Sequence, residues 1–522
     1  MSKADNVIEG PQDHTGADAS ADHFGGLLEA SNPVSNRELN TLDDPLGKNP
    51  AIGEWKLAWI TLNSTNVTPI AQRYRRQFIV VLCRSFLAYG WPTHRIEAQL
   101  TDVAECLGVK AEFSLLPTVI FAFFGDHTGR GSAMHVIKEP GGLSLERLQA
   151  TRNVLEAVTQ NQMSAYVGAK ALRTIHEADD TYGRKTKCLF AFLCGFVITL
   201  FAFQGAAADA LIGGLCAAGM AVLSLYLASE NPLIAKIFEL LGAFVISFIA
   251  RALYSNTEHQ FCYSAIASGG IVLILPGFTV MSAALEIATK VLLTGSMKIV
   301  FAIFRALFLG FVQTLGSDLY LRIDKNAMQQ RRSPKWSWPW YFQHPPWWSQ
   351  LFLVPLFALA LSLWNGQQLS WVEKKTVIVM VTCAGAAYAA NTIGGQHLTG
   401  AIGSTLGALA VGVCGNAYAR IFKAPAYVLM VPGVLLLVPT GLTAVGGLSK
   451  NYSGGNDQFE SGLNTGLAMI KVSIGVSVGL SLANFLIYVQ WWKLFCFLGL
   501  FKRWKREDEI KQRFQSKALF TF

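Results

Sequence analysis

Residues 376–419 have the sequence TVIVMVTCAGAAYAANTIGGQHLTGAIGSTLGALAVGVCGNAYA, which contains no Asp, Glu, Lys or Arg. About 20 apolar residues of α-helix cross the hydrocarbon core of a bilayer, so this segment is long enough to hold two membrane-spanning helices. Four further segments also lack these charged residues, at 188–208, 210–229, 259–285 and 424–449. The sequence therefore predicts a polytopic α-helical membrane protein.

The composition agrees with this prediction. Hydrophobic residues make up 52% of the 522 residues and charged residues only 15%, whereas about 25% of the residues of a typical soluble protein are charged. These values exclude a disordered protein, a collagen-like fibre and a conventional soluble enzyme. Much of the net charge of +9 lies in 184–187 and 502–506, which flank the first and last apolar segments. Basic flanks mark the cytoplasmic side of spans, and no basic face suited to a nucleic acid stands out.

We predict ten spans with both chain ends in the cytoplasm, because the carboxyl-terminal segment is also basic. Five spans, a polar connector and five more spans predict two halves that are inverted relative to each other, since an odd number of spans reverses the second half. One loop disagrees with the charge rule, because residues 316–349 would lie outside although they carry more basic than acidic residues. The predicted spans are 188–208, 210–229, 233–253, 263–283, 293–315, 350–366, 376–394, 398–416, 427–448 and 468–490.

Parts of the chain differ in composition and pattern. The first is rich in Asp, Asn, Ser, Gly and Pro and is predicted to be a disordered cytoplasmic tail. The second has helical and alternating patterns and is long enough to bury a core of its own. The predicted parts are the tail (1–65), a soluble α+β module (70–182), a five-helix membrane half (188–315), a connector (316–349), a second five-helix membrane half (350–490) and a basic cytoplasmic tail (491–522).

The soluble module is predicted to contain helices before and after a small sheet. Apolar residues from Tyr74 to Tyr89 recur at helical spacing, and Thr93 can cap a second helix that runs to Cys106. A period-two pattern, with turns that contain Gly and Pro, then predicts a three-stranded antiparallel sheet. The predicted strands are 111–116, 118–124 and 132–138, and two helices follow at 144–160 and 164–178.

Proline and glycine interrupt two of the predicted spans. Pro276-Gly277 lies in the fourth span of the first half, and Pro439-Thr440-Gly441 lies in the fourth span of the second half. Proline removes a backbone donor, and carbonyl groups freed inside a membrane must find partners in protein or in a wet cavity. Matching interruptions in two halves indicate the substrate or ion site of a transporter, whereas the alternative is a packing kink.

Ionisable residues within predicted spans are a second group of candidates. Glu239 and Arg305 lie deep in their spans, while Glu286 and Lys298 lie near span ends. Such groups are costly in lipid and face the interior of a bundle. A glutamate there could accept a coupling proton, and Arg305 could meet a substrate carboxylate or be the counter-charge of Glu239 and Glu286. The alternative is a structural Glu–Arg or Glu–Lys pair.

The segment between the seventh and eighth predicted spans is polar. It runs from Asn391 to Thr399 and includes Gln396 and His397. Two interpretations are open, a re-entrant segment that binds substrate or a tight loop.

Thr93, His94, Arg95, Glu97 and Asp126 are polar residues of the soluble module that a hydrolytic or metal site could use. No HExxH, GxSxG or phosphate-loop motif accompanies them, and the nine cysteines form no CxxC pair and no zinc-type array. We favour the alternative of helix capping and turn hydrogen bonds, so the sequence predicts no catalytic residue, metal ligand or cofactor.

Several of these segments, in this order, resemble the threonine/serine exporter family, and the arrangement also resembles the fungal pheromone-regulated membrane protein 10 group. The resemblance covers about residues 85–515. Two departures are the Gly- and His-containing segment after Asp126 and the Pro-Thr-Gly of the ninth span, where the family usually has a Pro-Gly pair. The motifs are YGWPTHRIE (89–97), FGD (124–126), GGLSLERL (141–148), NPLIAKIFE (231–239), LPG (275–277) through Glu286, and VPG (431–433) through Gly447.

The resemblance implies a secondary transporter that exports small amino acids such as threonine or serine, coupled to the proton gradient as an antiporter. Composition and spans alone predict only a polytopic transporter or channel. Two other classes stay open: an enzyme or regulatory module tethered by its membrane half, which would use residues 85–140, and a structural or signalling membrane protein without transport. The expected partners are the lipid bilayer, small amino acids and protons. The sequence leaves open whether the chain forms homo-oligomers and whether it resides in the plasma membrane or in an intracellular membrane such as that of the vacuole.

Overall fold

The computed structural model describes a large part of the chain between Pro69 and Gln490. The two predicted tails, 1–65 and 491–522, lie outside the described residues, as does 325–339 of the connector. The described residues are 69–125, 132–139, 141–228, 231, 234–256, 260–324, 340–369, 374–397, 400–422, 426–445 and 458–490.

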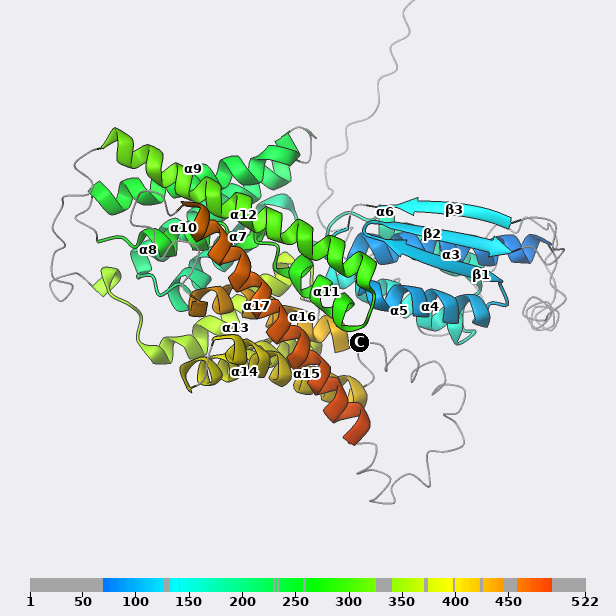
Figure 1. The fold of residues 1–522 in the computed structure, drawn as a ribbon. Coiled ribbons are helices and arrows are strands. Elements are labelled where there is room, and N and C mark those ends of the chain that lie inside the picture. The colour runs from blue at the N-terminus through cyan, green and yellow to red at the C-terminus, as the bar shows by residue number, and fades with distance from the viewer. Residues whose placement is uncertain are drawn as a thin grey trace, which may run out of the picture. The chain divides into compact units, whose positions relative to one another are not determined.

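The first described part is an α+β module (Figure 1). Its elements are α3 (Pro69–Tyr89), α4 (Thr93–Cys106), β1 (Ala111–Leu116), β2 (Val119–Gly125), β3 (Ser132–Lys138), α5 (Leu145–Thr159) and α6 (Ala165–Glu177). The three strands form an antiparallel sheet in the order β1-β2-β3. The strands, α5 and α6 each begin and end within one residue of the predicted positions, so the prediction of a small three-stranded sheet is confirmed.

One face of the sheet is covered by α3. Ile120 and Phe124 of β2 are fully buried, whereas Phe123, on the opposite face, is 39% exposed. Helix α3 contributes Phe78 and Leu82, which are four residues apart and fully buried. The buried residues of β2 alternate along the strand, and those of α3 recur at helical spacing. Both sets therefore lie on the inner faces of their elements and form one core.

The remaining described elements are mostly apolar helices. The first membrane half consists of α7 (Arg184–Phe201), α8 (Ala207–Val222) with the π-helical turn η2 (Leu223–Ala228), α9 (Ile234–Asn256), α10 (Tyr263–Gly270), the 3-10 turn η3 (Val272–Ile274), α11 (Gly277–Ala288) and α12 (Leu292–Ile323). The second half follows two short turns, η6 (Trp340–Phe342) and η7 (Trp347–Ser349), and consists of α13 (Gln350–Trp364), α14 (Lys374–His397), α15 (Gly400–Phe422), α16 (Ala426–Val445) and α17 (Gln458–Asn484) with η8 (Phe485–Gln490). These helices lie at the positions of the predicted spans.

Seven described helical segments are long and apolar enough to cross a bilayer, and the bent pair α10–α11 makes an eighth if it forms a single span. Helix α7 carries three basic residues among its 18, and the apolar part of α16, Ala426–Thr440, is shorter. The fold is therefore that of a multi-pass helical membrane protein, while the count of ten spans stays a prediction.

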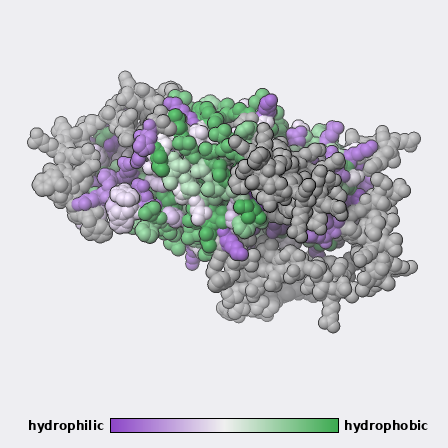
Figure 2. All heavy atoms as spheres, turned by 90° about the horizontal axis from the view of Figure 1, so that it is seen from below, coloured by the Kyte–Doolittle hydropathy of each residue, from purple (hydrophilic) through white to green (hydrophobic). Residues whose placement is uncertain are grey.

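The surface of these helices suits a lipid environment. Figure 2 shows hydrophobic residues gathered over the described middle of one face. On α12, the side chains of Phe301, Phe304 and Phe308 are all more than half exposed. Contiguous apolar surface of this kind is rare on soluble monomers and marks contact with a membrane or another protein.

The two membrane halves share long contacts. Helix α12 packs against α9 of its own half and against α17 of the other half, and α7 packs against α13. Helix α11 contacts α16 and α17. The bent pair α10–α11 therefore lies at the boundary between the halves, whose inverted relationship stays a prediction.

The core of the module continues into the second membrane half. Met380 of α14 and Val428 of α16 are fully buried in the same hydrophobic cluster as the core residues of α3 and the sheet. The backbone N–H of Leu145 also donates to the carbonyl of Asn365 at 3.0 Å. The module is therefore packed directly against the membrane helices.

Candidate functional site

The predicted interruption at Pro276-Gly277 is present in the structure. Helix α10 ends at Gly270, a 3-10 turn follows, and α11 begins at Gly277 with Pro276 as its N-cap residue. The two helices are bent by 47° relative to each other. A helix broken at this point exposes carbonyl groups at the end of α10 and N–H groups at the start of α11.

The interruption expected at Pro439 is wrong, while the alternative of a packing kink stays a prediction. Helix α16 is continuous and contains both Pro432 and Pro439; Gly441 also lies within it. The hydroxyl group of Thr440 donates to the Leu436 carbonyl at 2.9 Å. Prolines are tolerated in membrane helices where side chains and neighbouring helices satisfy the freed backbone groups, and the sequence alone does not show these partners.

The two proline-containing segments nevertheless touch each other. A Cβ atom built on Gly277 would lie 3.2–3.4 Å from three side-chain atoms of Val438, the residue before Pro439. The start of α11 can therefore approach α16 this closely because residue 277 has no side chain. The fourth and ninth predicted spans are thus neighbours in the structure.

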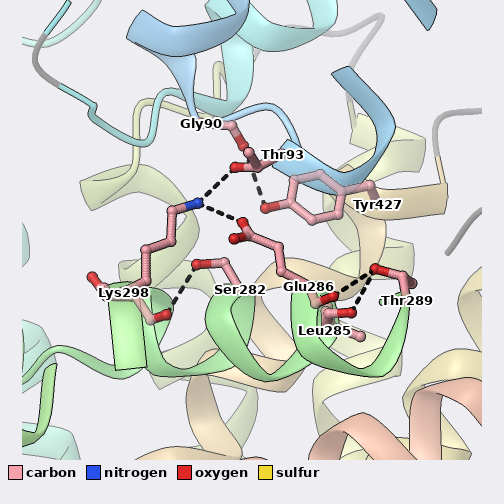
Figure 3. Close-up of polar contacts among 9 residues, drawn as sticks. Gly90, Thr93, Ser282, Leu285, Glu286, Thr289, Lys298 and Tyr427 are labelled. Carbon is pink, nitrogen blue, oxygen red and sulfur yellow. Dashed lines mark hydrogen bonds and ion pairs between the residues drawn. The ribbon is translucent and has the colours of Figure 1, made fainter. Parts of the chain in front are cut away.

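Glu286 is the fully buried acid of this region, with 0% of its surface exposed. Its Oε1 atom accepts a hydrogen bond from Nζ of Lys298 at 2.5 Å, and the same ammonium group donates to Oγ1 of Thr93 at 2.6 Å (Figure 3). One cation therefore links α11, α12 and helix α4 of the module.

The other carboxylate oxygen of Glu286, Oε2, is buried and has no hydrogen-bond partner among the described residues. Tyr427, at the start of α16, lies beside this carboxylate and interacts with it electrostatically, while its hydroxyl group donates to the Gly90 carbonyl at 3.4 Å (Figure 3). A buried acceptor without a partner costs about 1–3 kcal/mol. A hydrogen-bond donor placed at Oε2 would offset that cost.

Glu239 and Arg305 form a separate ion pair between α9 and α12. Nη2 of Arg305 lies 2.6 Å from Oε1 of Glu239, and both side chains are 27% exposed. The sequence-based hypothesis gave Arg305 to either glutamate as a counter-charge. In the structure, Arg305 forms its ion pair with Glu239. Glu286 instead pairs with Lys298, a residue that the sequence placed near a span end.

The polar segment after the seventh span is helical where the structure describes it. Asn391, Gln396 and His397 all lie in α14, so these three residues are helical, and both interpretations stay open for the connection at 398–399, which lies outside the described residues. Asn391 is buried and its amide donates to Oγ1 of Thr440 at 3.3 Å. Gln396 and His397 are exposed near the end of the helix. No proline precedes them in α14, so polarity here indicates exposure and not a break.

Among the module candidates, Thr93 contacts the membrane helices through Lys298. Arg95 and Glu97 follow it on α4, and Glu97 is exposed. Asp126 and the side chain of His94 lie outside the described residues, so their hypothetical hydrolytic role stays untested. Within the described part of the chain, no three His, Cys, Asp or Glu side chains are grouped as metal ligands.

Sequence reasoning missed a buried arginine on the far part of α9. Arg251 is 9% exposed, its Nε atom donates to Oγ of Ser317 at 2.6 Å, and its guanidinium group lies 4.1 Å from the ring centre of Tyr263. Tyr263 is the first residue of α10. The cluster therefore fixes the first half of the broken span against α9 and α12, and the signal for it is a single basic residue inside an apolar helix.

Comparison with known protein families supports the resemblance found in the sequence. A family model described as "Putative threonine/serine exporter" matches residues 77–320, and a second described as "Threonine/Serine exporter, ThrE" matches residues 350–486. No solved structure matches the chain.

Curated relatives include fungal proteins named pheromone-regulated membrane protein 10. The protein from Eremothecium gossypii is 30% identical over 440 residues, which are 81% of this chain and 57% of that protein. The protein from Candida albicans is 32% identical over 452 residues, which are 81% of this chain and 39% of that protein. The protein from Saccharomyces cerevisiae is 29% identical over 443 residues, which are 81% of this chain and 55% of that protein. The chain thus spans about half the length of the curated relatives it matches.

Proposed function

Because the chain belongs to the threonine/serine exporter family, we propose that it is a secondary transporter that exports small amino acids such as threonine and serine in exchange for protons. The chain is an integral multi-pass membrane protein, and its family is one of membrane transporters. The family supports transport in general. We propose in addition the substrate, the direction of transport and the coupling of transport to protons.

The observation that carries the proposal is the buried carboxylate at the end of a broken span. Glu286 lies in α11, ten residues after the break at Pro276, and one of its oxygens has no partner among the described residues. Glu286 lies at the boundary between the two membrane halves. In transporters built from structural repeats, the coupling-ion sites lie at the interface between the repeats.

Protonation of Glu286 would change the contacts that close this region. A neutral carboxyl group no longer attracts the Lys298 ammonium as an ion, so the link from α11 and α12 to Thr93 of the module weakens. When Glu286 releases the proton on the other side of the membrane, its ion pair with Lys298 forms again. The carboxylate thus couples proton occupancy to the packing of the module against the broken span.

The break itself suits an amino-acid zwitterion. The N–H groups in the first turn of α11 lie at the positive end of a helix dipole and are proposed to meet the carboxylate, and carbonyl groups at the end of α10 are proposed to meet the ammonium group.

Purified full-length protein in liposomes tests the proposal. Labelled L-threonine or L-serine should move across the bilayer in response to a pH step, and the movement should collapse when a protonophore removes the gradient. Equal tracer movement in protein-free liposomes, or movement indifferent to the pH step and to the protonophore, would contradict proton-coupled transport.

A further inference from the structure

The module contains a cleft beside the open edge of its sheet. Strand β3 has a neighbour on one side only, because the strand order is β1-β2-β3. Along this edge, residues of α3, β3 and the last turns of α6 enclose a volume of about 570 Å³. Clefts that hold small organic molecules commonly have volumes of about 300–1,000 Å³.

Apolar and charged groups are both present in the cleft. Val80 and Val81 of α3 and Val136 of β3 provide aliphatic surface, and Val136 is 54% exposed. The charged lining groups are three cations and two carboxylates, which leaves one net positive charge with histidine neutral. The cleft therefore suits a small molecule with an aliphatic part and a single negative group.

Two of the three cations are available to such a group. Arg84 forms an ion pair with Glu139. Lys138 and Arg173 form no hydrogen bond or ion pair with other residues in the part of the chain that the structure describes, and both are exposed. A carboxylate placed between them would accept charge-assisted hydrogen bonds from both sides of the cleft.

A histidine provides a further polar atom. Nδ1 of His176 lies 3.2 Å from the hydroxyl group of Tyr89. Burial raises the pKa of Tyr89 above its ordinary value, so this hydroxyl stays protonated at neutral pH and can donate to Nδ1. A neutral imidazole that accepts at Nδ1 carries its hydrogen on Nε2, which leaves a donor for a ligand in the cleft.

We propose that this cleft binds a small aliphatic carboxylate, held by Lys138 and Arg173 with its apolar part on Val80, Val81 and Val136. A multiply charged phosphate compound fits less well, because Glu139 and Glu177 also line the cleft. An α-amino acid and a simple carboxylic acid share the chemistry that the cleft recognises, and Glu177 could in addition accept the ammonium group of an amino acid. The proposal does not depend on the transport site at Glu286.

Ligand titration of the purified full chain by calorimetry tests the proposal with three matched probes. Isovalerate carries a carboxylate, isovaleramide replaces it by a neutral amide of the same shape, and L-valine adds an ammonium group. We expect saturable binding of isovalerate or L-valine with a dissociation constant on the order of 0.1–1 mM, and binding of isovaleramide at least about tenfold weaker. Tighter binding of L-valine would identify amino acids as the source, and equal binding would identify the carboxylate alone.

Variants locate the binding. The double change Lys138→Gln/Arg173→Gln should weaken it at least about tenfold, whereas Lys170→Gln, which removes one positive charge on α6 outside the cleft, should alter it less than about twofold. Val136→Trp should block the cleft sterically without touching a charge. Absence of saturable binding by both carboxylates, or equal binding by the parent and the double variant, would overturn the proposal.

Discussion

Nζ of Lys298 on α12 lies 2.5 Å from Oε1 of Glu286, which is twelve residues earlier in the chain, on the preceding helix α11. Both groups are shielded from water, because Glu286 is fully buried and the Lys298 side chain is 19% exposed. A buried ion pair is weak evidence for a stabilising role, since the loss of hydration offsets much of the attraction. Its place beside a broken span and against the module is more readily explained by a contact that must form and break.

Glu286→Gln is expected to abolish threonine movement driven by a pH step while the protein still inserts into membranes. Glutamine keeps the shape of the side chain but neither binds nor releases a proton, and it leaves Lys298 without its counter-charge. Removing one partner of a buried pair costs about 3–5 kcal/mol, and the partial exposure of Lys298 places the effect at the lower end or below. Proteoliposome transport and thermal unfolding measure the two effects.

The double variant Glu286→Gln/Lys298→Gln separates function from stability. It contains no uncompensated charge, so thermal stability should recover toward the parent value, while transport should stay lost. Proton-driven transport at the parent rate in the double variant would show that the pair is structural only.

Gly277→Leu is expected to abolish transport, and Gly277→Ala to reduce it. A Cβ atom at this position would lie 3.2 Å from Cγ1 of Val438, and overpacking of this kind costs about 1–3 kcal/mol. Adding Val438→Ala to Gly277→Ala should restore part of the transport, since it removes Cγ1 and Cγ2 of Val438, two of the three atoms in contact. Gly385→Ala in α14 is the matched control, because no atom lies within 4 Å of the added methyl group. If Gly277→Leu transports like the parent, the break is not part of the pathway.

The local features of this fold could be predicted from the sequence. Strands at 111–116 and 132–138 follow from alternation and from glycine-containing turns, and the break at Pro276-Gly277 follows from backbone chemistry within one segment. These features depend on residues that are neighbours in the chain. The predicted positions therefore agree closely with the observed ones.

Features that depend on distant residues could not be predicted. The hydrogen bond between Lys298 and Thr93 joins residues 205 positions apart. The continuity of α16 at Pro439 is accompanied by the contact of Thr440 with Asn391, 49 positions away. The sequence shows that such groups are present inside spans but gives no pairing, so it assigned Arg305 to the wrong partner as readily as to the right one.

The topology prediction can be tested by labelling with a membrane-impermeant thiol reagent. In a background without the nine native cysteines and in intact, correctly oriented membranes, we expect Lys170→Cys, on α6 of the module, to be protected and Asn451→Cys to be labelled from the non-cytoplasmic side. The reason is that the module precedes the first predicted span, whereas residues 450–464 follow the ninth. Labelling of both positions from the same side would show an even number of spans between them.

Thr93→Val is expected to loosen the module from the broken span. Valine keeps the size of threonine but cannot accept the hydrogen bond from Lys298, and such a bond contributes about 0.5–1.5 kcal/mol, with bonds to charged groups at the upper end or above. Separation of α4 from α11 and α12 should therefore become more frequent by about five- to tenfold, which hydrogen exchange at the start of α4 and at the end of α11 would report.

Thr101→Val is the matched control on the same helix, because Thr101 donates only to the Glu97 carbonyl one turn earlier. If the contact regulates access to Glu286, Thr93→Val should also change the initial rate of transport, and Thr101→Val should leave it unaltered. Identical exchange and identical transport in the two variants would show that Thr93 and Lys298 touch without coupling the module to the membrane helices.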